Sequence, residues 1–227
     1  MANDAMIIAV DQIRFTYLKK KKMRVYAVGI AADNRGKILV TEPPASASIR
    51  HNPKAGRPAI WDFGGDGYPI YQRTGDLADI MAAHLLVVRD RGGARKAGDI
   101  VRAVSENSDA QNVIKKVGSN LGSLGAGGLA AASALGMVLP VANIVGKIIS
   151  DKRDKVLQTL SGSLFLDKER READEFSQTI KAPDGNMELE ADVFLFDGVI
   201  DEDSAAETKD AETRLEADGL LFTNEDN

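Results

Sequence analysis

Residues 83–100 read AHLLVVRDRGGARKAGDI, and this stretch decides the fold that we expect. Residues 85–88 (LLVV) form a short apolar run that is rich in β-branched side chains. Such a run suits a buried strand better than a helix, because a helix needs a longer apolar pattern. Residues 91–94 (RGGA) then form a loop, and the chain becomes apolar again at Ile100. We therefore predict a central strand that ends in a long loop, in a β-sandwich.

Composition places the chain among folded soluble proteins. It has 227 residues, of which 44% are hydrophobic and 28% are charged, enough for one large domain or two small ones. Cysteine is absent, which excludes disulfides and thiolate metal sites. The first residues lack the basic segment of a signal peptide, and their apolar run covers only residues 5–10. We expect a cytoplasmic protein.

Charge is divided unevenly along the chain. Residues 201–227 hold ten acids and two bases, a formal charge of −8, although the whole chain carries −5. The other 200 residues therefore carry +3. We interpret residues 201–227 as an acidic, solvated tail, with a helix at residues 205–217 and an apolar hook at residues 220–222 (LLF).

Three strands are predicted near the start of the chain, at residues 6–18, 24–31 and 37–41. The first alternates between mainly apolar and mainly polar positions, as a half-buried strand does. Residues 33–36 (DNRG) are a strong turn signal between the second and third strands. We expect the three strands to form an antiparallel meander. Its first turn would consist of four consecutive lysines, Lys19, Lys20, Lys21 and Lys22.

Further strands are expected in two later regions. Residues 60–72 have β character on both sides of a glycine-rich turn. After residue 160, a strand is predicted at residues 162–166. Residues 175–180 and 188–196 then form a hairpin around a Pro-Asp-Gly-Asn turn.

A helical insertion of two or three helices is predicted at residues 106–160. Apolar residues recur there at helical spacing, and Ser108 with Gln111 fits a capping box. Residues 117–146 contain no charge, Pro140 should end or kink a helix, and residues 142–160 read as a further helix. Small residues recur at every fourth position and could form a helix-packing interface: Gly118, Gly122, Ala126, Ala130 and Ala134.

The uncharged stretch at residues 118–149 has three interpretations. It could pack against the sandwich, pair with a second subunit, or enter a membrane, since it exceeds the roughly 20 residues that a span needs. Scattered Ser and Asn residues and the glycine cluster at residues 125–128 argue against a span, because lipid offers no replacement hydrogen bonds. We expect a packing surface.

Three short segments are similar to a known family. Residues 88–90 (VRD) and 97–99 (AGD) resemble, in order and spacing, motifs of the calcium-dependent lipid-binding (CaLB) β-sandwich family, and residues 58–63 (PAIWDF) resemble another of its motifs around Trp61. The resemblance covers roughly residues 5–105 and implies a sandwich. Two positions where the family has calcium-binding carboxylates are here Gly92 and Arg95. The resemblance therefore implies a calcium-independent member.

Two groups of basic residues are candidate sites. The loop after the central strand carries Arg91, Arg95 and Lys96, which would repel a cation and could bind an anion. The lysine run could contact anionic lipid, at about 1 kcal/mol per lysine. It could equally be a solvated turn that protects a sheet edge from aggregation.

Catalytic signatures are weak. The two histidines are His51, in a Pro-rich loop, and His84, in the central strand, and no spacing suggests a nucleophile with its base. Asp62 with Asp66, or Asp76 with Asp79, could form an acid–base or metal pair, but aspartate is also a common turn residue. We expect no catalytic residues, no metal and no cofactor. Aromatic residues make up 5% of the chain, and no basic–aromatic pattern points to nucleic acid.

These observations predict a mainly β chain with a helical insertion (α+β). The expected architecture is an antiparallel β-sandwich of about eight strands plus two or three helices, within residues 1–200, followed by the tail. The expected function is a non-enzymatic interaction or assembly module whose helical insertion contacts a protein partner or another copy of the chain. The alternative is a peripheral membrane protein that uses the lysine run and the apolar helices, and an enzyme of unknown type is third.

Overall fold

Eleven strands and four helices are found in the described part of the chain. The structure is a computed structural model. It describes residues 5–18, 21–42, 46–50, 56–65, 67–75, 77–91, 98–124, 128–171, 173, 175–196 and 219–222.

The outer sheet has five antiparallel strands with β1 at its centre. β1 pairs along one edge with β10, which pairs in turn with β9. The other edge of β1 is shared by two short strands, β5 and β6. The strands are β1 (Ala5–Phe15), β5 (Ala59–Asp62), β6 (Tyr68–Thr74), β9 (Glu175–Lys181) and β10 (Met187–Phe196).

The central sheet has six strands in the order β11-β3-β2-β7-β8, with β4 also pairing with β2. All of its pairs are antiparallel. The strands are β2 (Lys22–Asp33), β3 (Ile38–Thr41), β4 (Ala47–Arg50), β7 (Ile80–Arg89), β8 (Lys155–Phe165) and β11 (Gly219–Phe222).

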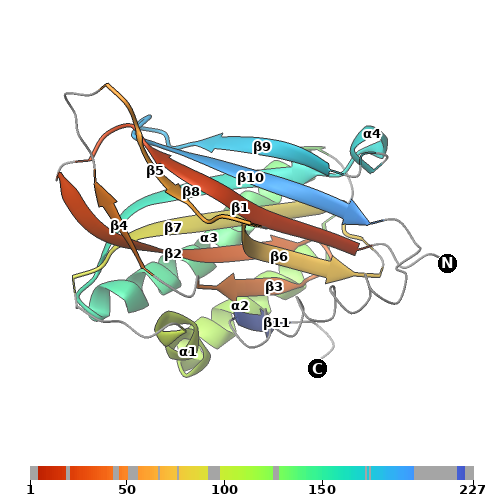
Figure 1. The fold of residues 1–227 in the computed structure, drawn as a ribbon. Coiled ribbons are helices and arrows are strands. Elements are labelled where there is room, and N and C mark those ends of the chain that lie inside the picture. The colour runs from red at the N-terminus through yellow and green to blue at the C-terminus, as the bar shows by residue number, and fades with distance from the viewer. Residues whose placement is uncertain are drawn as a thin grey trace.

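Three helices form a third layer, on the side of the central sheet that faces away from the outer sheet (Figure 1). They connect β7 to β8 and are α1 (Asp99–Ser105), α2 (Ser108–Leu121) and α3 (Gly128–Asp151). A short fourth helix, α4 (Lys168–Arg171), lies between β8 and β9.

The central sheet is buried on both faces because it separates two hydrophobic cores. In β2, Val25 and Ala27 face the sandwich core between the sheets, whereas Tyr26 and Val28 face the helix core beneath α1, α2 and α3. β7 alternates in the same way. A strand buried on both faces has an apolar sequence without polar alternation, which explains the continuous run at residues 85–88.

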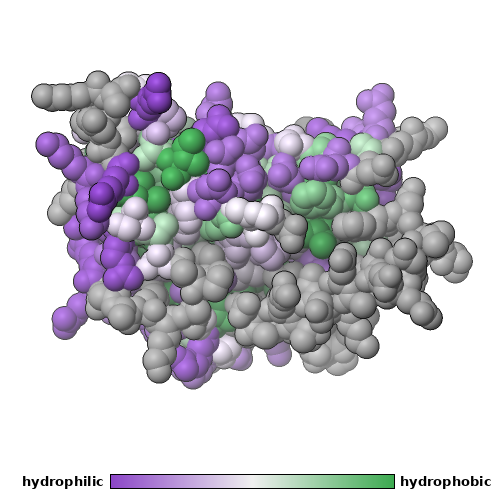
Figure 2. Space-filling view, in the orientation of Figure 1, coloured by the Kyte–Doolittle hydropathy of each residue, from purple (hydrophilic) through white to green (hydrophobic). Residues whose placement is uncertain are grey.

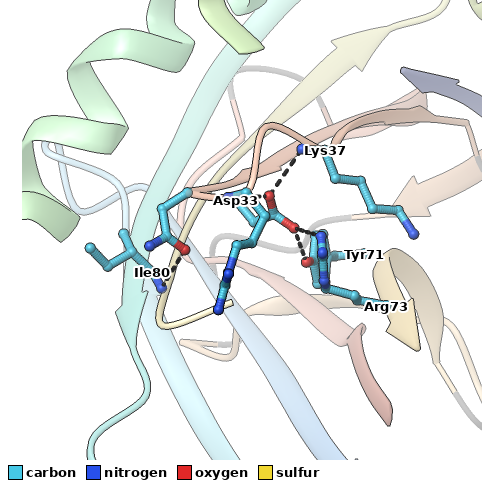
Figure 3. A network of polar contacts seen from close by, with 7 residues as sticks. Asp33, Lys37, Tyr71, Arg73 and Ile80 are labelled. Atoms are coloured by element: carbon cyan, nitrogen blue, oxygen red, sulfur yellow. Dashed lines mark hydrogen bonds and ion pairs between the residues drawn. The ribbon is translucent and has the colours of Figure 1, made fainter. Parts of the chain in front are cut away.

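A buried polar network closes the β2–β3 turn (Figure 3). Asp33 is fully buried, and its Oδ1 accepts hydrogen bonds from the backbone N–H groups of Arg35 (2.8 Å) and Lys37 (3.0 Å). Its Oδ2 accepts from the Tyr71 hydroxyl (2.6 Å) and from the Arg73 guanidinium (2.7 Å). Because Tyr71 and Arg73 belong to β6, this carboxylate joins the two sheets. Burial and the adjacent Asp33 raise the pKa of Tyr71, so its hydroxyl keeps its proton.

The predicted fold class is confirmed: the described part of the chain is mainly β, with two antiparallel sheets and four helices. The central strand is confirmed as β7, and the late hairpin as β9 and β10. The predicted meander is wrong, because β1 and β2 belong to different sheets. In the sequence, the lysine run therefore falls between strands of two different sheets, and Lys22 is the first residue of β2.

The predicted bounds of the helical insertion, residues 106–160, are also wrong. The helices begin earlier, at Asp99, and end at Asp151. β8 then begins at Lys155 and pairs with the whole length of β7. Residues 155–160 continue the apolar spacing of α3, but Arg153 adopts a left-handed conformation (φ 68°) that ends the helix.

Two further predictions concern the cap of α2 and the acidic tail. Asn107, and not Ser108, caps α2, because its side chain accepts a hydrogen bond from the Ala110 N–H (2.9 Å). The helix expected at residues 205–217 lies outside the described residues. The apolar hook in the tail belongs to β11, which pairs with β3.

Candidate functional site

The helix α3 has a buried side and an exposed side. Its buried side packs on β7 and β8 through apolar residues that include Val138, Val141 and Val145, each with no exposed surface. Its opposite side is exposed and carries no charge until Lys147. The exposed uncharged residues, here called the outer face of α3, are Ala132, Ser133, Gly136, Leu139, Pro140 and Asn143.

The outer face of α3 contains an exposed hydrophobic side chain and an interior proline. Leu139 is 45% exposed and is the exposed large hydrophobic residue of the described helices. Pro140 was expected to end or kink a helix. It does not end α3, which continues to Asp151. Proline cannot donate to the carbonyl of Gly136, four residues earlier. Both residues are exposed, so water has access to that carbonyl.

The small residues at four-residue spacing do not form one stripe, because they lie on two helices. Gly118 is buried in α2, and Gly122 is exposed directly after it. Ala134 is buried in the helix core, and Ala130 packs partly against that core. Ala126 lies outside the described residues. The predicted helix-packing interface is therefore covered within the chain at Gly118 and Ala134.

Length and composition would allow Ala130–Asp151 to cross a membrane. The core helix of a soluble protein meets the same two criteria, and α3 packs one side on the central sheet.

On the opposite side of the molecule, the coloured part of the outer-sheet face in Figure 2 is mainly hydrophilic, although it includes the 53% exposed Ile60 of β5. Figure 2 shows hydrophobic side chains there in small separate patches. The uncharged surface of α3 thus contrasts with the outer sheet.

His84 joins the helical layer to the sheet. It lies in β7, opposite Ser161 of β8, and is 2% exposed. Its Nε2 is 3.1 Å from the carbonyl oxygen of Leu135 in α3, and its Nδ1 is 2.8 Å from the Ser161 hydroxyl. A carbonyl can only accept, so Nε2 carries the proton and the Ser161 hydroxyl donates to Nδ1 of the neutral ring.

A serine hydroxyl beside a histidine nitrogen is also the arrangement of a nucleophile and its base. Here His84 is buried between β7, β8 and α3, and its second nitrogen binds a main-chain carbonyl. We assign the pair a structural role, that of holding α3 on the sheet.

We expect His84 to make stability depend on pH. Burial lowers the pKa of His84 below its ordinary value of 6.5, against the opposing effect of the bond to Leu135. As the pH falls through about 6.5, the unfolded chain binds a proton that the folded chain does not, so the free energy of unfolding decreases. His84→Gln should lose this part of the pH dependence. Urea unfolding of both proteins at about pH 7.5 and about pH 5 measures it, and equal pH dependences would contradict the assignment.

The basic residues of the two other candidate sites are partly described. Lys21 and Lys22 are exposed, whereas Lys19 and Lys20 lie outside the described residues. Arg91 is exposed, and its backbone N–H donates to Asp154 (2.8 Å). Arg95 and Lys96 lie outside the described residues. Neither basic group is described in full, so both sites stay expectations.

The loop at residues 90–99 should not bind calcium, because two positions where the CaLB family has carboxylates hold Gly92 and Arg95. Thermal melts in millimolar calcium and in chelator should coincide. A calcium-dependent rise of several degrees would contradict this expectation, because a ligand that binds only the folded state stabilises it.

The candidate aspartate pairs have turn and ion-pair roles where they are described. Asp62 accepts a hydrogen bond from the Gly64 N–H (2.7 Å), and Asp79 pairs with Arg171 (2.5 Å). Asp66 and Asp76 lie outside the described residues. Within the described ranges, no group of three or more His, Cys, Asp or Glu side chains could hold a metal ion.

One acidic cluster was missed from the sequence because a β-bulge and three separate strands bring it together. The pKa of Asp11 in β1 is raised, first by burial and then by neighbouring carboxylates, while Arg14 lowers it. These carboxylates are, in order of effect, Asp192, Asp62 and Glu190.

Comparisons of this chain with protein-family models, with curated proteins and with solved structures find no match. The resemblance to the CaLB family stays an expectation from three short segments.

Proposed function

We propose that this chain is a non-catalytic assembly module, and that the outer face of α3 contacts a second copy of the chain. The observation that carries the proposal is the composition of this face. It has no charge over six exposed positions, and it includes a 45% exposed Leu139. Contiguous apolar surface on a soluble protein marks interaction sites, and Ala132, Gly136, Leu139 and Pro140 supply the apolar part of this face.

A helix of a second copy fits this face better than a flat surface does. Ala132 and Gly136 are four residues apart and exposed, so the backbone of an opposing helix could approach closely. Leu139, one turn further on, would supply the apolar contact. A two-fold arrangement would place the same residues on both sides of the interface.

The alternative is attachment to a membrane surface. The hydropathy of Ala130–Asp151 favours it, and exposed Lys21 and Lys22 could contact anionic headgroups. Full insertion of α3 would require the helix to leave the sheet, which would expose to water the side chains of β7 that it covers, such as Leu86 and Val88, and break the hydrogen bond to His84. Each buried side chain of this kind contributes about 1.5–3 kcal/mol. This cost favours an assembly role.

We expect Leu139→Lys to shift the chain toward a monomer. The substitution places a charge in the middle of the proposed contact, where it would have to be desolvated. Light scattering over a concentration series should give a mass above 24.3 kDa for the original chain and close to 24.3 kDa for the variant. Asn112→Lys, at an exposed position of α2, is the matched control and should behave as the original chain does.

Vesicle flotation separates the two functions. The original chain could be monomeric at every concentration and float with anionic vesicles, while the Leu139→Lys variant does not float. This result would overturn the assembly proposal in favour of the membrane alternative. A monomer that does not float would overturn both.

A further inference from the structure

The edge of β3 accepts a short strand from the far end of the chain. β3 pairs on one side with β2 and on the other with β11, in the register Ile38 with Phe222 through to Thr41 with Gly219. β11 lies beside β3 where α1 and α2 also approach (Figure 1). All four residues of β3 are buried, although the strand is only four residues long.

Contacts other than β11 hold β3 in place. The Thr41 hydroxyl is 2.7 Å from the Tyr68 hydroxyl of β6, which ties β3 to the outer sheet. Glu42, which follows β3 directly and is 4% exposed, accepts a hydrogen bond from the Ile100 N–H at the start of α1 (3.0 Å). β3 is thus held by β2, by Tyr68 of β6 and by the start of α1. We therefore expect the edge of β3 that pairs with β11 to stay ordered if β11 leaves it.

The strand that fills this edge is attached by a long connection. Residues 197–218, which lie outside the described residues, separate β11 from the end of β10. At about 3.3 Å per residue, this segment could span roughly 70 Å. That reach exceeds the diameter of a domain of this size, so β11 could extend to a neighbouring molecule.

We propose that copies of this chain exchange β11, so that the β11 of one copy pairs with the β3 of another. The exchanged strand would form the same antiparallel backbone hydrogen bonds in the same register as the strand it replaces. The two arrangements then differ mainly in the entropy of the tether, which is the usual condition for strand exchange. This inference is independent of the outer face of α3, since β3 and β11 lie at the edge of the central sheet.

The absence of cysteine permits a direct test by disulfide formation. Leu39 and Leu221 are register partners, and partners on paired strands lie close enough for a disulfide. A Leu39→Cys chain is mixed with a Leu221→Cys chain under mild oxidation. A disulfide between the two chains requires β11 of the second to lie on β3 of the first.

The mixture should give a disulfide-linked heterodimer whose amount rises with protein concentration between about 0.1 and 1 mM. A strand tethered within one chain competes at an effective concentration on the order of mM. Tyr17→Cys, at a 53% exposed position, mixed with Leu221→Cys measures random collision. We expect about ten times more heterodimer from the register pair than from this control. The double variant Leu39→Cys/Leu221→Cys should form a disulfide within one chain when dilute.

Two results would overturn the proposal. In the first, the mixture of Leu39→Cys and Leu221→Cys chains gives no more heterodimer than the Tyr17→Cys control mixture, although the double variant forms its internal disulfide. In the second, the double variant forms no internal disulfide, which would show that β11 does not pair with β3. Val40 with Leu220 is a second register pair that repeats the test if cysteine at position 39 prevents folding. Repeating the mixture with Leu139→Lys in both chains should leave the heterodimer unchanged, which distinguishes strand exchange from contact through α3.

Discussion

Replacing Asp33 by alanine should lower the free energy of unfolding by about 3–5 kcal/mol, which is typical of removing one partner of a buried ion pair. The substitution leaves the Arg73 guanidinium, 20% exposed, without its 2.7 Å carboxylate contact. It also removes the acceptor for the fully buried Tyr71 hydroxyl and for two backbone N–H groups of the β2–β3 turn. Urea unfolding followed by circular dichroism measures the change.

Two further variants control this result. Asp184→Ala removes an aspartate that also accepts a backbone N–H in a turn (Asn186, 3.0 Å) but is exposed, so it should cost at most about 1 kcal/mol. Tyr71→Phe removes one hydrogen bond to Asp33 and should cost about 1–2 kcal/mol. Equal effects of Asp33→Ala and Asp184→Ala would show that the buried network contributes no more than an ordinary turn.

Replacing Trp61 by alanine should also cost about 3–5 kcal/mol, because it removes the largest side chain from the sandwich core. Trp61 is 7% exposed, and its ring lies 4.5 Å from that of Phe63, which in turn stacks on Tyr68. Urea unfolding monitored by circular dichroism follows the variant, which has no tryptophan.

The neighbouring residue provides the control. Ile60 lies in the same strand but points to the opposite face and is 53% exposed. Ile60→Ala should change stability by no more than about 0.5 kcal/mol. In the original chain, the fluorescence maximum should move to longer wavelength on unfolding. A native maximum already typical of indole in water would contradict the burial of Trp61.

Strands could be predicted where the pattern of side chains reports burial directly. β7 is apolar throughout because it faces two cores, and in β10 Leu189, Ala191 and Val193 alternate with acidic or aromatic neighbours because one face is outward. The pairing of β1 could not be predicted, because a half-buried strand has the same pattern whichever strand lies beside it. Its partner, β10, is at the other end of the domain.

The boundary between α3 and β8 shows why element types are confused. Val156, Leu157 and Leu160 fit the helical spacing of Ile148 and Ile149, so the pattern continues across a break. The break depends on the left-handed backbone at Arg153, for which glycine is the usual signal.

The polar contacts were beyond prediction for a different reason. The sequence identifies residues 33–36 as a turn, which is correct. It does not reveal that Asp33 meets Tyr71 and Arg73 across the two sheets, since these contacts depend on how the layers stack. The same holds for His84, whose partners come from β8 and α3.

The pairing of Ala5 with Phe196 has a consequence for synthesis of the chain. During translation, β1 leaves the ribosome first, but its main partner β10 follows after nearly all of the sandwich and helical residues. β2, β3 and β7 can meet earlier, because they are close in sequence and pair with one another. We expect the central sheet to form while β1 is not yet paired with β10. The outer sheet should therefore form last. Long-range pairing of this kind slows folding. We therefore expect the nascent chain to expose the apolar side of β1 until β10 has been synthesised. The chain should depend most on chaperones during this interval.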